Sequence, residues 1–427
     1  MASLAADLEF RGLIHQVSDP ELRTKLDAGG LVGYVGFDPS ASTLHVGNLL
    51  QLCLLRRLQG AGHRPIVVAG GGTGRIGDPG GKDAERPLLT KEQLRENLAG
   101  IRAQLGRFLD FSAGSARPAL LLDNAEWLDG VSFIDFLRDV GKHFTVNQMI
   151  ARDSVRSRFE RADQGISFTE FAYMLVQAYD FLHLFDAYGC TLQMGGSDQW
   201  GNIVTGVELI RRARGATAYA LTTPLVTRAD GTKFGKSESG AVFLDPAVTS
   251  PYSFYQYFFR SEDAVVGSYL RMLTFLSPEE ILGLDEATSE RPGERAAQRA
   301  LARAMTDLVH GEPETARVER AAAALYGEDV SALDEATLLM VVEDAPVTTV
   351  PWSSLEGEGI EVVPLLVTCG LAPSRGAART AVSQGGVYVN NRRVVGEGAR
   401  VTRSDLVAGR YVLVRRGRRE VHLVQLA

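Results

Sequence analysis

Two lysines stand three positions apart in the segment Lys-Phe-Gly-Lys-Ser, which runs from Lys233 to Ser237. Lysine is rare in this chain, since arginine supplies nearly all of its 45 basic residues. Two ammonium groups on a glycine-containing loop can neutralise a polyphosphate whose charge changes during a reaction. The alternative is a solvated turn, and the scarcity of lysine elsewhere argues against it. The segment therefore predicts a loop that contacts phosphates.

A second polar segment, Pro-Ser-Ala-Ser-Thr-Leu-His-Val-Gly-Asn, runs from Pro39 to Asn48 and ends at the start of a predicted helix. Free backbone amides and polar side chains at a helix start bind anions. Gly47 would allow a flat ligand to lie against the backbone. Taken alone, His45 could equally be a helix cap or a surface residue. Together with the lysine pair, the segment indicates a nucleotide site.

Residues 70–82, Gly-Gly-Gly-Thr-Gly-Arg-Ile-Gly-Asp-Pro-Gly-Gly-Lys, form a glycine-rich stretch after a predicted strand. It contains G-x-G-x-x-G at Gly72, Gly74 and Gly77. In a dinucleotide-binding site a helix should begin directly at this motif, whereas here the sequence indicates that the loop continues, which argues against such a site. A Walker A loop is excluded, because Asp83 follows Gly-Lys where serine or threonine is required. The stretch predicts a wide loop whose backbone approaches a nucleotide, with an ordinary surface loop as the alternative.

The elements that would position these loops follow a strand, helix, strand order. Residues 31–38 and 64–69 read as buried strands, and a helix is expected from His45 through Leu58 between them. This βαβ unit predicts a parallel sheet, with functional loops at the carboxyl ends of its strands. Further strands are expected over residues 118–122 and 190–194.

The composition changes after about residue 250, where helical spacing dominates without a strand pattern. Two helices are expected there, over residues 294–309 and 314–325. Residues 343–360 are rich in Val, Pro, Ser and Gly and favour a linker. Beyond it, three short apolar runs predict a small α+β module: residues 387–389, 411–414 and 421–425.

These motifs resemble those of one family. The segment His45-Val46-Gly47-Asn48 resembles the HIGH motif of class I aminoacyl-tRNA synthetases, and Lys233 to Ser237 resembles their KMSKS loop. Three pocket segments are similar to bacterial-type tyrosyl-tRNA synthetases: Tyr34 to Pro39, Tyr173-x-x-x-Gln177-x-x-Asp180, and Gly195 to Asn202. The resemblance extends over essentially the whole chain.

The resemblance implies an α/β fold class: a Rossmann-like parallel-sheet catalytic domain, then an all-helical domain and a small α+β RNA-binding module. The implied boundaries are a catalytic domain over 1–247, an anticodon-binding domain over 248–330, a linker over 331–360 and an S-four-type RNA-binding domain over 361–427. The implied activity is that of a tyrosine–tRNA ligase. It activates L-tyrosine with ATP to tyrosyl-adenylate plus pyrophosphate, then transfers tyrosine to the 3′-terminal ribose of its tRNA.

The residues implied for the tyrosine pocket can be checked against helical spacing and side-chain polarity. Helical spacing places Tyr173, Gln177 and Asp180 on one face. Such a stripe is often core packing, but Gln and Asp are poor core residues without polar partners. The resemblance implies that Tyr34 and Asp180 hold the phenolic hydroxyl, so that phenylalanine would leave polar groups unpaired. It assigns the substrate ammonium to Tyr173, Gln177 and Asp78. The full tyrosine-binding set is Tyr34, Asp78, Tyr173, Gln177, Asp180, Gln193 and Gln199.

The activation step needs no general base, because the substrate carboxylate is already ionised at neutral pH. Alignment and phosphate neutralisation remain, and the resemblance assigns them to His45, Asn48, Lys82, Arg86, Lys233 and Lys236. The implied ATP-binding set is Gly36, Asp38, Ser40, His45, Gly47, Asn48, Gly196, Asp198, Lys233, Lys236 and Ser237. Mg²⁺ would be carried on the nucleotide, and no protein-bound metal is predicted. Asn48 departs from the family's second histidine and is expected to act as a neutral donor.

Charge is distributed unevenly along the chain. The net charge is −7, which taken alone argues mildly against a nucleic-acid partner. Residues 361–427, however, hold eleven Arg against four acidic residues, while the preceding part is acidic. This segment predicts a phosphate-binding surface. The resemblance assigns it to tRNA, with contacts from Arg415, Arg416, Arg418 and Arg419 on an expected hairpin turn.

The sequence favours a soluble cytoplasmic protein without membrane contact. Its three cysteines are widely spaced, its N-terminus does not resemble a signal peptide, and no apolar run is long enough to span a bilayer. The resemblance also implies a homodimer. Two other functions stay open: another HxGH-type nucleotidyltransferase, which would need neither the helical domain nor the basic tail, and an inactive RNA-binding paralogue.

Overall fold

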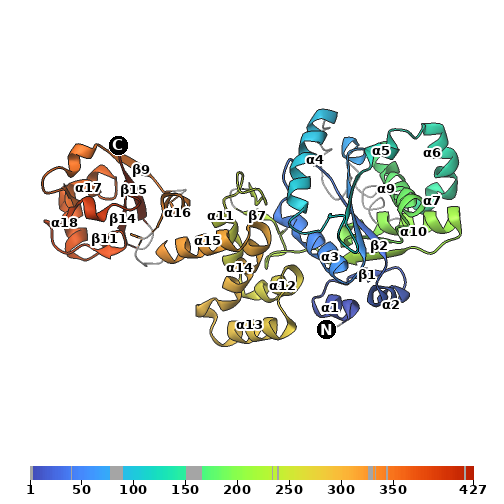
Figure 1. Cartoon of the computed structure of the whole chain (residues 1–427), viewed down its shortest axis with the longest axis horizontal. Coiled ribbons are helices and arrows are strands. Elements are labelled where there is room, and N and C mark those ends of the chain that lie inside the picture. Colours follow the sequence, from blue (N-terminus) through green and yellow to red (C-terminus); the bar gives the residue numbers. More distant parts are fainter. Residues whose placement is uncertain are drawn as a thin grey trace. The chain divides into compact units, whose positions relative to one another are not determined.

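The computed structural model of the chain (Figure 1) describes residues 3–39, 41–76, 90–150, 166–232, 234–237, 240–325, 330–331, 333–342, 345–417 and 420–427. The chain divides into two compact units. The first consists of Met1–Thr249 and Tyr257–Val309, and the second of Ser250–Gln256 and His310–Ala427.

The first unit is built on a six-stranded sheet, counted over the described residues, with the order β1-β6-β5-β2-β3-β4. The strands are β1 (Gln16–Val17), β2 (Val32–Phe37), β3 (Arg64–Ala69), β4 (Leu120–Asp123), β5 (Leu192–Gly196) and β6 (Tyr219–Thr223). All neighbours are parallel except β1 and β6, so the sheet is mixed. The four strands predicted from the sequence are confirmed, and the edge strand β1 and its neighbour β6 are additional.

The strand order places the chain's direction change next to β2. From β2 the chain adds β3 and β4 on one side, and then β5 and β6 on the other. In open α/β sheets, ligands bind beyond the carboxyl ends of the strands at such a switch point. The carboxyl ends of β2 and β5 therefore mark the expected site.

Helices cover the sheet. Helix α3 (Leu49–Gly60), preceded by the short helix η1 (Val46–Asn48), connects β2 to β3. Helix α9 (Phe168–Tyr188) and helix α10 (Trp200–Arg214) pack against a shared apolar core with the inward side chains of β2 and β3. Helix α9 begins at a capping box in which Ser167 and Glu170 bind each other's backbone amides, and it ends at Gly189 with φ 65°.

Shorter helices complete the first unit. They are α1 (Leu4–Phe10), α2 (Glu21–Ala28), η2 (Thr73–Arg75), α4 (Lys91–Leu105), α5 (Ala125–Leu128), α6 (Phe133–Asp139), η3 (Gly141–His143), α7 (Val146–Ile150) and η4 (Ser197–Gln199). A two-stranded ribbon, β7 (Lys236–Ser237) and β8 (Gly240–Ala241), precedes the all-helical part. That part contains α12 (Asp263–Leu273), α13 (Pro278–Glu290), η5 (Pro292–Glu294) and α14 (Ala296–His310). Helix α11 (Pro251–Phe259) gives its first residues to the second unit and its last to the first.

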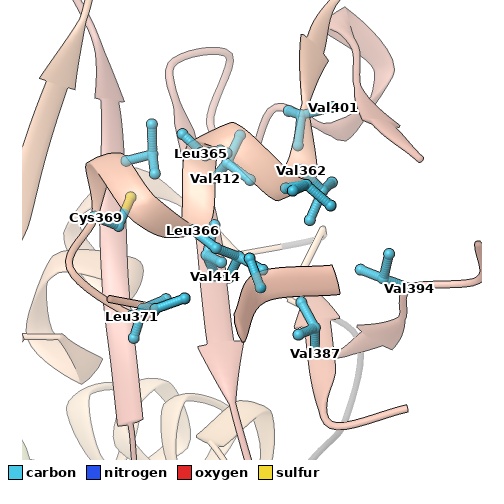
Figure 2. Packing of buried hydrophobic residues seen from close by; sticks show 14 of the residues in the cluster. Val362, Leu365, Leu366, Cys369, Leu371, Val387, Val394, Val401, Val412 and Val414 are labelled. Atoms are coloured by element: carbon cyan, nitrogen blue, oxygen red, sulfur yellow. The ribbon is translucent and has the colours of Figure 1, made fainter. Parts of the chain in front are cut away.

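The second unit contains α15 (Glu312–Leu325), α16 (Glu335–Val341) and a sheet with the order β12-β11-β14-β15-β9. Its strands are β9 (Val347–Val350), β11 (Val387–Val389), β12 (Arg392–Arg393), β14 (Tyr411–Arg416) and β15 (Glu420–Leu426). Helices α17 (Val362–Thr368) and α18 (Arg375–Ser383) pack on it, with η6 (Trp352–Leu355), η7 (Arg403–Asp405) and the strand pair β10 (Ile360–Glu361) and β13 (Arg400–Val401) at its margin. Figure 2 shows Leu365 and Leu366 of α17 against Val412 and Val414 of β14.

The three apolar runs predicted from the sequence are β11, β14 and β15, and the helices expected over 294–309 and 314–325 are α14 and α15. The range interpreted as a linker differs from that expectation. Residues 331–360 contain α16 and β9, and β9 pairs in parallel with β15. A four-residue edge strand is too short to produce a periodic pattern among Pro, Ser and Gly. For that reason β9 could not be recognised in the sequence. The domain boundaries stay a prediction.

No helix among the described residues is long and apolar enough to cross a membrane.

Candidate active site

One of the residues predicted to bind tyrosine carries a buried carboxyl group. Asp180 on α9 is 4% exposed, and its Oδ2 accepts a hydrogen bond from Nδ2 of Asn124 at 2.9 Å. Its Oδ1 accepts from Nε1 of Trp127 at 2.7 Å. Burial raises the pKa of this carboxyl to about 7, although the two hydrogen bonds act in the opposite direction. The site therefore holds a buried carboxyl group that is close to the balance between its charged and neutral forms near neutral pH.

Tyr34 on β2 belongs to the same pocket. Its side chain is 2% exposed, and its ring lies 5.4 Å from that of Phe181, the residue after Asp180. Burial raises the pKa of the phenol well above its usual value, and the charge of Asp180 adds to this effect. The Tyr34 hydroxyl is buried and has no hydrogen-bond partner among the described residues. A buried hydroxyl without a partner costs free energy, so it points to a ligand that supplies one.

Gln193 is the neighbour of Tyr34 across the sheet. The two residues are paired in register on the parallel strands β5 and β2, which puts their side chains on the same face. Gln193 is 2% exposed, and its Oε1 is also buried without a partner among the described residues. Two unsatisfied polar atoms thus lie on adjacent strands at the site that the sequence assigns to tyrosine.

The other amides of the predicted pocket form a small network. Nδ2 of Asn202 on α10 donates to Oε1 of Gln177 at 3.0 Å and to Oε1 of Gln199 at 3.3 Å. Tyr173 is 5% exposed and lies on the face of α9 that carries Asp180, as the spacing predicts. One amide nitrogen of Asn202 therefore holds the side-chain oxygens of both glutamines, which orients their amide groups.

Sequence reasoning missed Asn124 and Trp127, which hold Asp180 in place. Asn124 also accepts a hydrogen bond from the backbone N of Gly72 at 2.7 Å and donates to Oγ1 of Thr73 at 3.0 Å. It therefore connects the pocket to the glycine-rich loop after β3. The available signal was an Asp-Asn pair directly after the apolar strand β4, at the sheet edge where function is expected.

The predicted nucleotide motif forms a closed cap at the start of η1. Nδ1 of His45 accepts from the backbone N of Gly47 at 3.0 Å, and the backbone N of His45 donates to Oδ1 of Asn48 at 3.0 Å. Because Nδ1 accepts this bond, a neutral His45 ring carries its proton on Nε2. Asn48 uses its oxygen for the cap, so its donor function falls to Nδ2.

The lysine-containing segment lies against this motif. The backbone N of Val46 donates to the O of Val242 at 2.9 Å, and Val242 N donates to the O of Gly235 at 3.2 Å. Gly235 has φ 103°, and a Cβ at this position would lie 3.3 Å from the backbone N of Gly47. The structure thus brings together two segments that the sequence places far apart, and the contact requires glycine.

The glycines and acids assigned to ATP lie at the carboxyl ends of β2 and β5. A Cβ added to Gly36 would meet nothing within 4 Å, so the backbone faces open space there. A Cβ at Gly196 would lie 2.5 Å from Oδ1 of Asp198, and one at Gly70 would lie 2.9 Å from Oδ1 of Asp38. These close approaches put both carboxylates beside the switch point of the sheet.

Several predicted site residues lie outside the described residues: Ser40, Asp78, Lys82, Arg86, Lys233, Arg418 and Arg419. Of Lys236 and Ser237 only the backbone, in β7, is described.

In the second unit, the predicted hairpin is formed by β14 and β15, with Gly417 at φ 62° in the turn. The guanidinium of Arg415 lies over the ring of Tyr388, 4.8 Å from its centroid. Nη1 of Arg416 donates to the O of Leu371 at 2.8 Å and lies 3.8 Å from Oε2 of Glu420. The two arginines therefore make contacts within this unit as well as carrying charge to its surface.

Comparisons with known proteins agree along the whole chain. Residues 28–327 match the family described as tRNA synthetases class I (W and Y), and residues 342–424 match the tyrosine–tRNA ligase SYY-like C-terminal domain. The tyrosine–tRNA ligase of Roseiflexus castenholzii is 53% identical over 426 residues, covering 100% of both chains. That of Bacillus caldotenax is 48% identical, covering 99% of this chain and 100% of its own.

Among solved structures, a C-terminally truncated mitochondrial tyrosyl-tRNA synthetase of Aspergillus nidulans is similar with a TM-score of 0.68 and 32% identity, covering 76% of this chain and 94% of its own. The tyrosyl-tRNA synthetase of Archaeoglobus fulgidus, at 19% identity and a TM-score of 0.53, shares the fold. With its pocket, its two apposed motifs and these matches, the chain belongs to the tyrosine–tRNA ligase family of class I tRNA synthetases.

Proposed function

We propose that this chain catalyses the two-step charging of a tRNA with tyrosine. L-tyrosine and ATP give tyrosyl-adenylate and pyrophosphate, and the tyrosyl group then passes to the 3′-terminal ribose of the tRNA. The observation that carries the proposal is the buried hydroxyl of Tyr34, which has no hydrogen-bond partner among the described residues and lies close enough to the carboxyl group of Asp180 for that charge to raise the pKa of the phenol. A substrate phenol fits this pair, because it can accept from Tyr34 and donate to Asp180.

The pocket chemistry supports tyrosine over phenylalanine. Each oxygen of Asp180 already accepts one hydrogen bond, from Asn124 or Trp127, and a carboxylate has room for more. Phenylalanine would fill the same volume and leave the buried polar groups of Tyr34 and Asp180 without a partner, which a hydrogen-bonding site strongly disfavours. Selection of tyrosine thus rests on the hydrogen bonds to Tyr34 and Asp180 that phenylalanine cannot make.

The activation step relies on alignment and charge. The substrate carboxylate attacks the α-phosphate, the bond to the bridging oxygen breaks, and pyrophosphate leaves with the negative charge. Nε2 of His45 and Nδ2 of Asn48 would donate to the phosphates from the helix start. The cationic groups Lys82, Arg86, Lys233 and Lys236 are proposed for the opposite side. Mg²⁺ is proposed to arrive on the nucleotide.

We also propose that the chain acts as a homodimer through apolar side chains of α6, α7 and the first turn of α9. Phe133 and Ile134 are 61% and 70% exposed, and Phe168 is 67% exposed. Leu137 and Val146 add to the same group of helices at 44% and 58%. Large exposed apolar groups gathered on neighbouring elements are typical of protein interfaces, and a second copy is the commonest partner.

The C-terminal segment is the proposed tRNA surface, on the basis of its eleven Arg against four acidic residues. The cytoplasm is the proposed location. All three cysteines, Cys53, Cys190 and Cys369, are free and buried, which fits a compartment that keeps thiols reduced.

Tyrosine-dependent exchange of pyrophosphate into ATP tests the activity, followed by charging of a tRNA pool with labelled tyrosine. The expected result is exchange that requires tyrosine, and charging that requires RNA. Absence of exchange would favour an inactive RNA-binding protein. Nucleotide chemistry without a tyrosine requirement would favour another nucleotidyltransferase.

A further inference from the structure

Two tyrosine hydroxyls hold the two ends of the segment between Thr227 and Gly235. The hydroxyl of Tyr269, on α12, donates to the backbone O of Thr227 at 2.8 Å. The hydroxyl of Tyr257, on α11, accepts from the backbone N of Gly235 at 2.8 Å. Both bonds are made to the backbone, so they fix the positions of Thr227 and Gly235 whatever side chains lie between them.

The ring of Phe234 is packed between the same tyrosines. Its centroid lies 5.4 Å from that of Tyr257 and 5.0 Å from that of Tyr269, both edge-on, and 6.1 Å from that of Phe258. Tyr269 is 4% exposed and Phe258 is fully buried. We call these four residues the aromatic anchor. Edge-to-face packing favours this geometry beyond simple burial of area.

Gly235, directly after Phe234, makes the contact with Gly47 described above. The aromatic anchor therefore determines how closely the lysine-containing segment approaches the helix start that carries His45 and Asn48. The segment is thus contacted both by the anchor and by the nucleotide motif.

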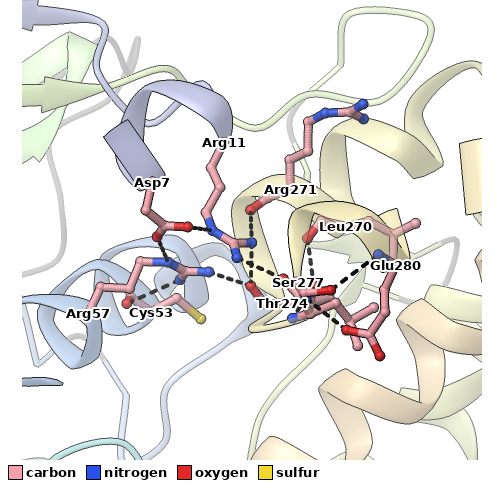
Figure 3. A network of polar contacts seen from close by, with 10 residues as sticks. Asp7, Arg11, Cys53, Arg57, Leu270, Arg271, Thr274, Ser277 and Glu280 are labelled. Carbon is pink, nitrogen blue, oxygen red and sulfur yellow. Dashed lines mark hydrogen bonds and ion pairs between the residues drawn. The ribbon is translucent and has the colours of Figure 1, made fainter. Parts of the chain in front are cut away.

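The far end of α12 is tied to the helix that the nucleotide motif begins. Figure 3 shows Arg57 of α3 donating to the backbone O of Thr274, the residue that ends α12. Sγ of Cys53, one turn earlier on α3, contacts the O of Leu273 at 3.2 Å. The start of α3 therefore contacts the lysine-containing segment, and buried side chains in the middle of α3 contact the end of α12.

Arg11 of α1 strengthens this connection. Its guanidinium donates to the O of Arg271 at 3.1 Å, of Thr274 at 3.0 Å and of Leu276 at 2.8 Å, while Asp7 accepts from Nε of both Arg11 and Arg57 (Figure 3). Carbonyls at a helix C-terminus have no partner within the helix and carry partial negative charge, so two buried guanidinium groups are well matched to them.

We propose that Tyr257 and Tyr269 are positioning residues for tyrosine activation, which hold the segment from Thr227 to Gly235 at the distance from the nucleotide motif that the transition state requires. The inference rests on the proposed function and deepens it. The phosphates change their charge distribution only as pyrophosphate leaves, so displacement of this segment weakens transition-state contacts more than ground-state contacts. Tyrosine binding, at the pocket of Tyr34 and Asp180, does not pass through these hydroxyls.

The test compares Tyr257→Phe and Tyr269→Phe with Tyr219→Phe in the full-length chain. Each variant keeps its ring and loses one hydroxyl hydrogen bond. That of Tyr219, the first residue of β6, is made to Oε2 of Glu21 at 3.0 Å and not to the segment from Thr227 to Gly235, which makes it the matched control. The measurements are kcat and the ATP KM in pyrophosphate exchange, the tyrosine dissociation constant by fluorescence titration, and the thermal unfolding midpoint.

The expected result is a fall in kcat of about three- to tenfold for Tyr257→Phe and for Tyr269→Phe, the effect of one hydrogen bond on a rate. Tyrosine affinity and the unfolding midpoint should match those of Tyr219→Phe, whose kcat should equal that of the wild type. Because both hydroxyls hold one segment, the double variant should lose less than the product of the two single losses.

Three results would overturn the proposal: unchanged kcat in both variants, an equal loss of kcat in Tyr219→Phe, or a loss of tyrosine affinity as large as the loss of kcat. Absence of exchange in the wild type would instead reject the proposed function, so the two failures are distinguishable.

Discussion

The carboxyl group of Asp180, which is 4% exposed, accepts a hydrogen bond from the indole N–H of Trp127 at 2.7 Å. The bond favours the charged carboxylate, while burial favours the neutral acid and is the larger effect. Its pKa of about 7 places this group at the balance between the two forms under ordinary assay conditions. The same residue therefore links substrate recognition to the pH dependence of stability.

Asp180→Asn should change how the free energy of unfolding varies with pH. Between the ordinary carboxyl pKa of 3.8 and about 7, the unfolded chain has lost the proton that the folded chain keeps. Rising pH therefore costs the wild type about 1.4 kcal/mol per unit in this window relative to the variant, and nothing further above it. Denaturant unfolding across the window checks this. Trp127→Phe removes a bond that lowers the pKa, so its window should extend to higher pH. Parallel profiles for wild type and Asp180→Asn would contradict the assignment.

Tyr34→Phe should reduce selection of tyrosine over phenylalanine. The change removes the hydroxyl that would donate to the substrate phenol, so tyrosine loses a bond while phenylalanine loses nothing. The ratio of kcat/KM for the two amino acids in pyrophosphate exchange should fall by about tenfold, the value of roughly one hydrogen bond. Stability of the free protein should not decrease, because the hydroxyl that is removed has no partner among the described residues. An unchanged ratio would exclude the contact.

Asn48→Asp and Asn48→Ala should separate the two functions of this side chain. Aspartate keeps the oxygen that accepts from the backbone N of His45, so its stability should stay near that of the wild type. Alanine loses the cap and should cost about 1 kcal/mol of unfolding free energy. Both should lower kcat, and aspartate more strongly, because it places negative charge beside the phosphates. Equal kcat values for Asn48→Asp and wild type would show that Nδ2 makes no hydrogen bond to a phosphate.

Ile134→Lys should weaken self-association. An ammonium group in an apolar interface must be desolvated, and substitution of one central residue typically weakens binding by about 30-fold. Val248→Lys is the matched control, since Val248 is 58% exposed and lies outside α6, α7 and α9. Sedimentation velocity over a range of concentrations measures the effect. A monomeric wild type, or equal association of both variants, would reject the proposed surface.

Replacing Arg418 and Arg419 by Glu should weaken tRNA charging without changing pyrophosphate exchange. The KM for tRNA should rise, and the slope of its logarithm against log salt should shrink by about one for each phosphate that the protein no longer neutralises. Substitution is preferable to deletion of residues 361–427, because deletion would remove the partner strand of β9 and expose Val350 and Leu355, whose core partners lie in the deleted range. Normal charging by the substituted protein would require another role for the basic segment.

The fold could be anticipated where a pattern extends over several turns or a whole strand. The apolar run of β2 and β3 and the capped, periodic helix α9 were of this kind. The stripe of Tyr173 and Asp180 on one helix face followed from spacing alone. Strand β9 did not, because four residues at a sheet edge carry too little periodicity.

The residue types of the site could be predicted, but the contacts between its residues could be predicted less well. That Tyr34 and Asp180 share a pocket depends on pairing between distant elements, and only resemblance to a family indicated it. Asn124 and Trp127 were missed because their importance lies in which carboxylate they bind. The contact between Gly235 and Gly47 likewise depends on tertiary packing, since neither glycine differs in sequence from those of ordinary turns.

The bonds of Arg11 bear on how the protein forms during synthesis. Its acceptor at Thr274 lies 263 residues further along the chain. Helix α1 can therefore complete its contacts only after residues 274–276 have left the ribosome. Until then, the positive charge of Arg11 relies on Asp7 as its local partner, and the surface that α1 will cover stays open. The packing of α1 is thus a late event in biosynthesis, because its distant contacts form only after their acceptors have been synthesised.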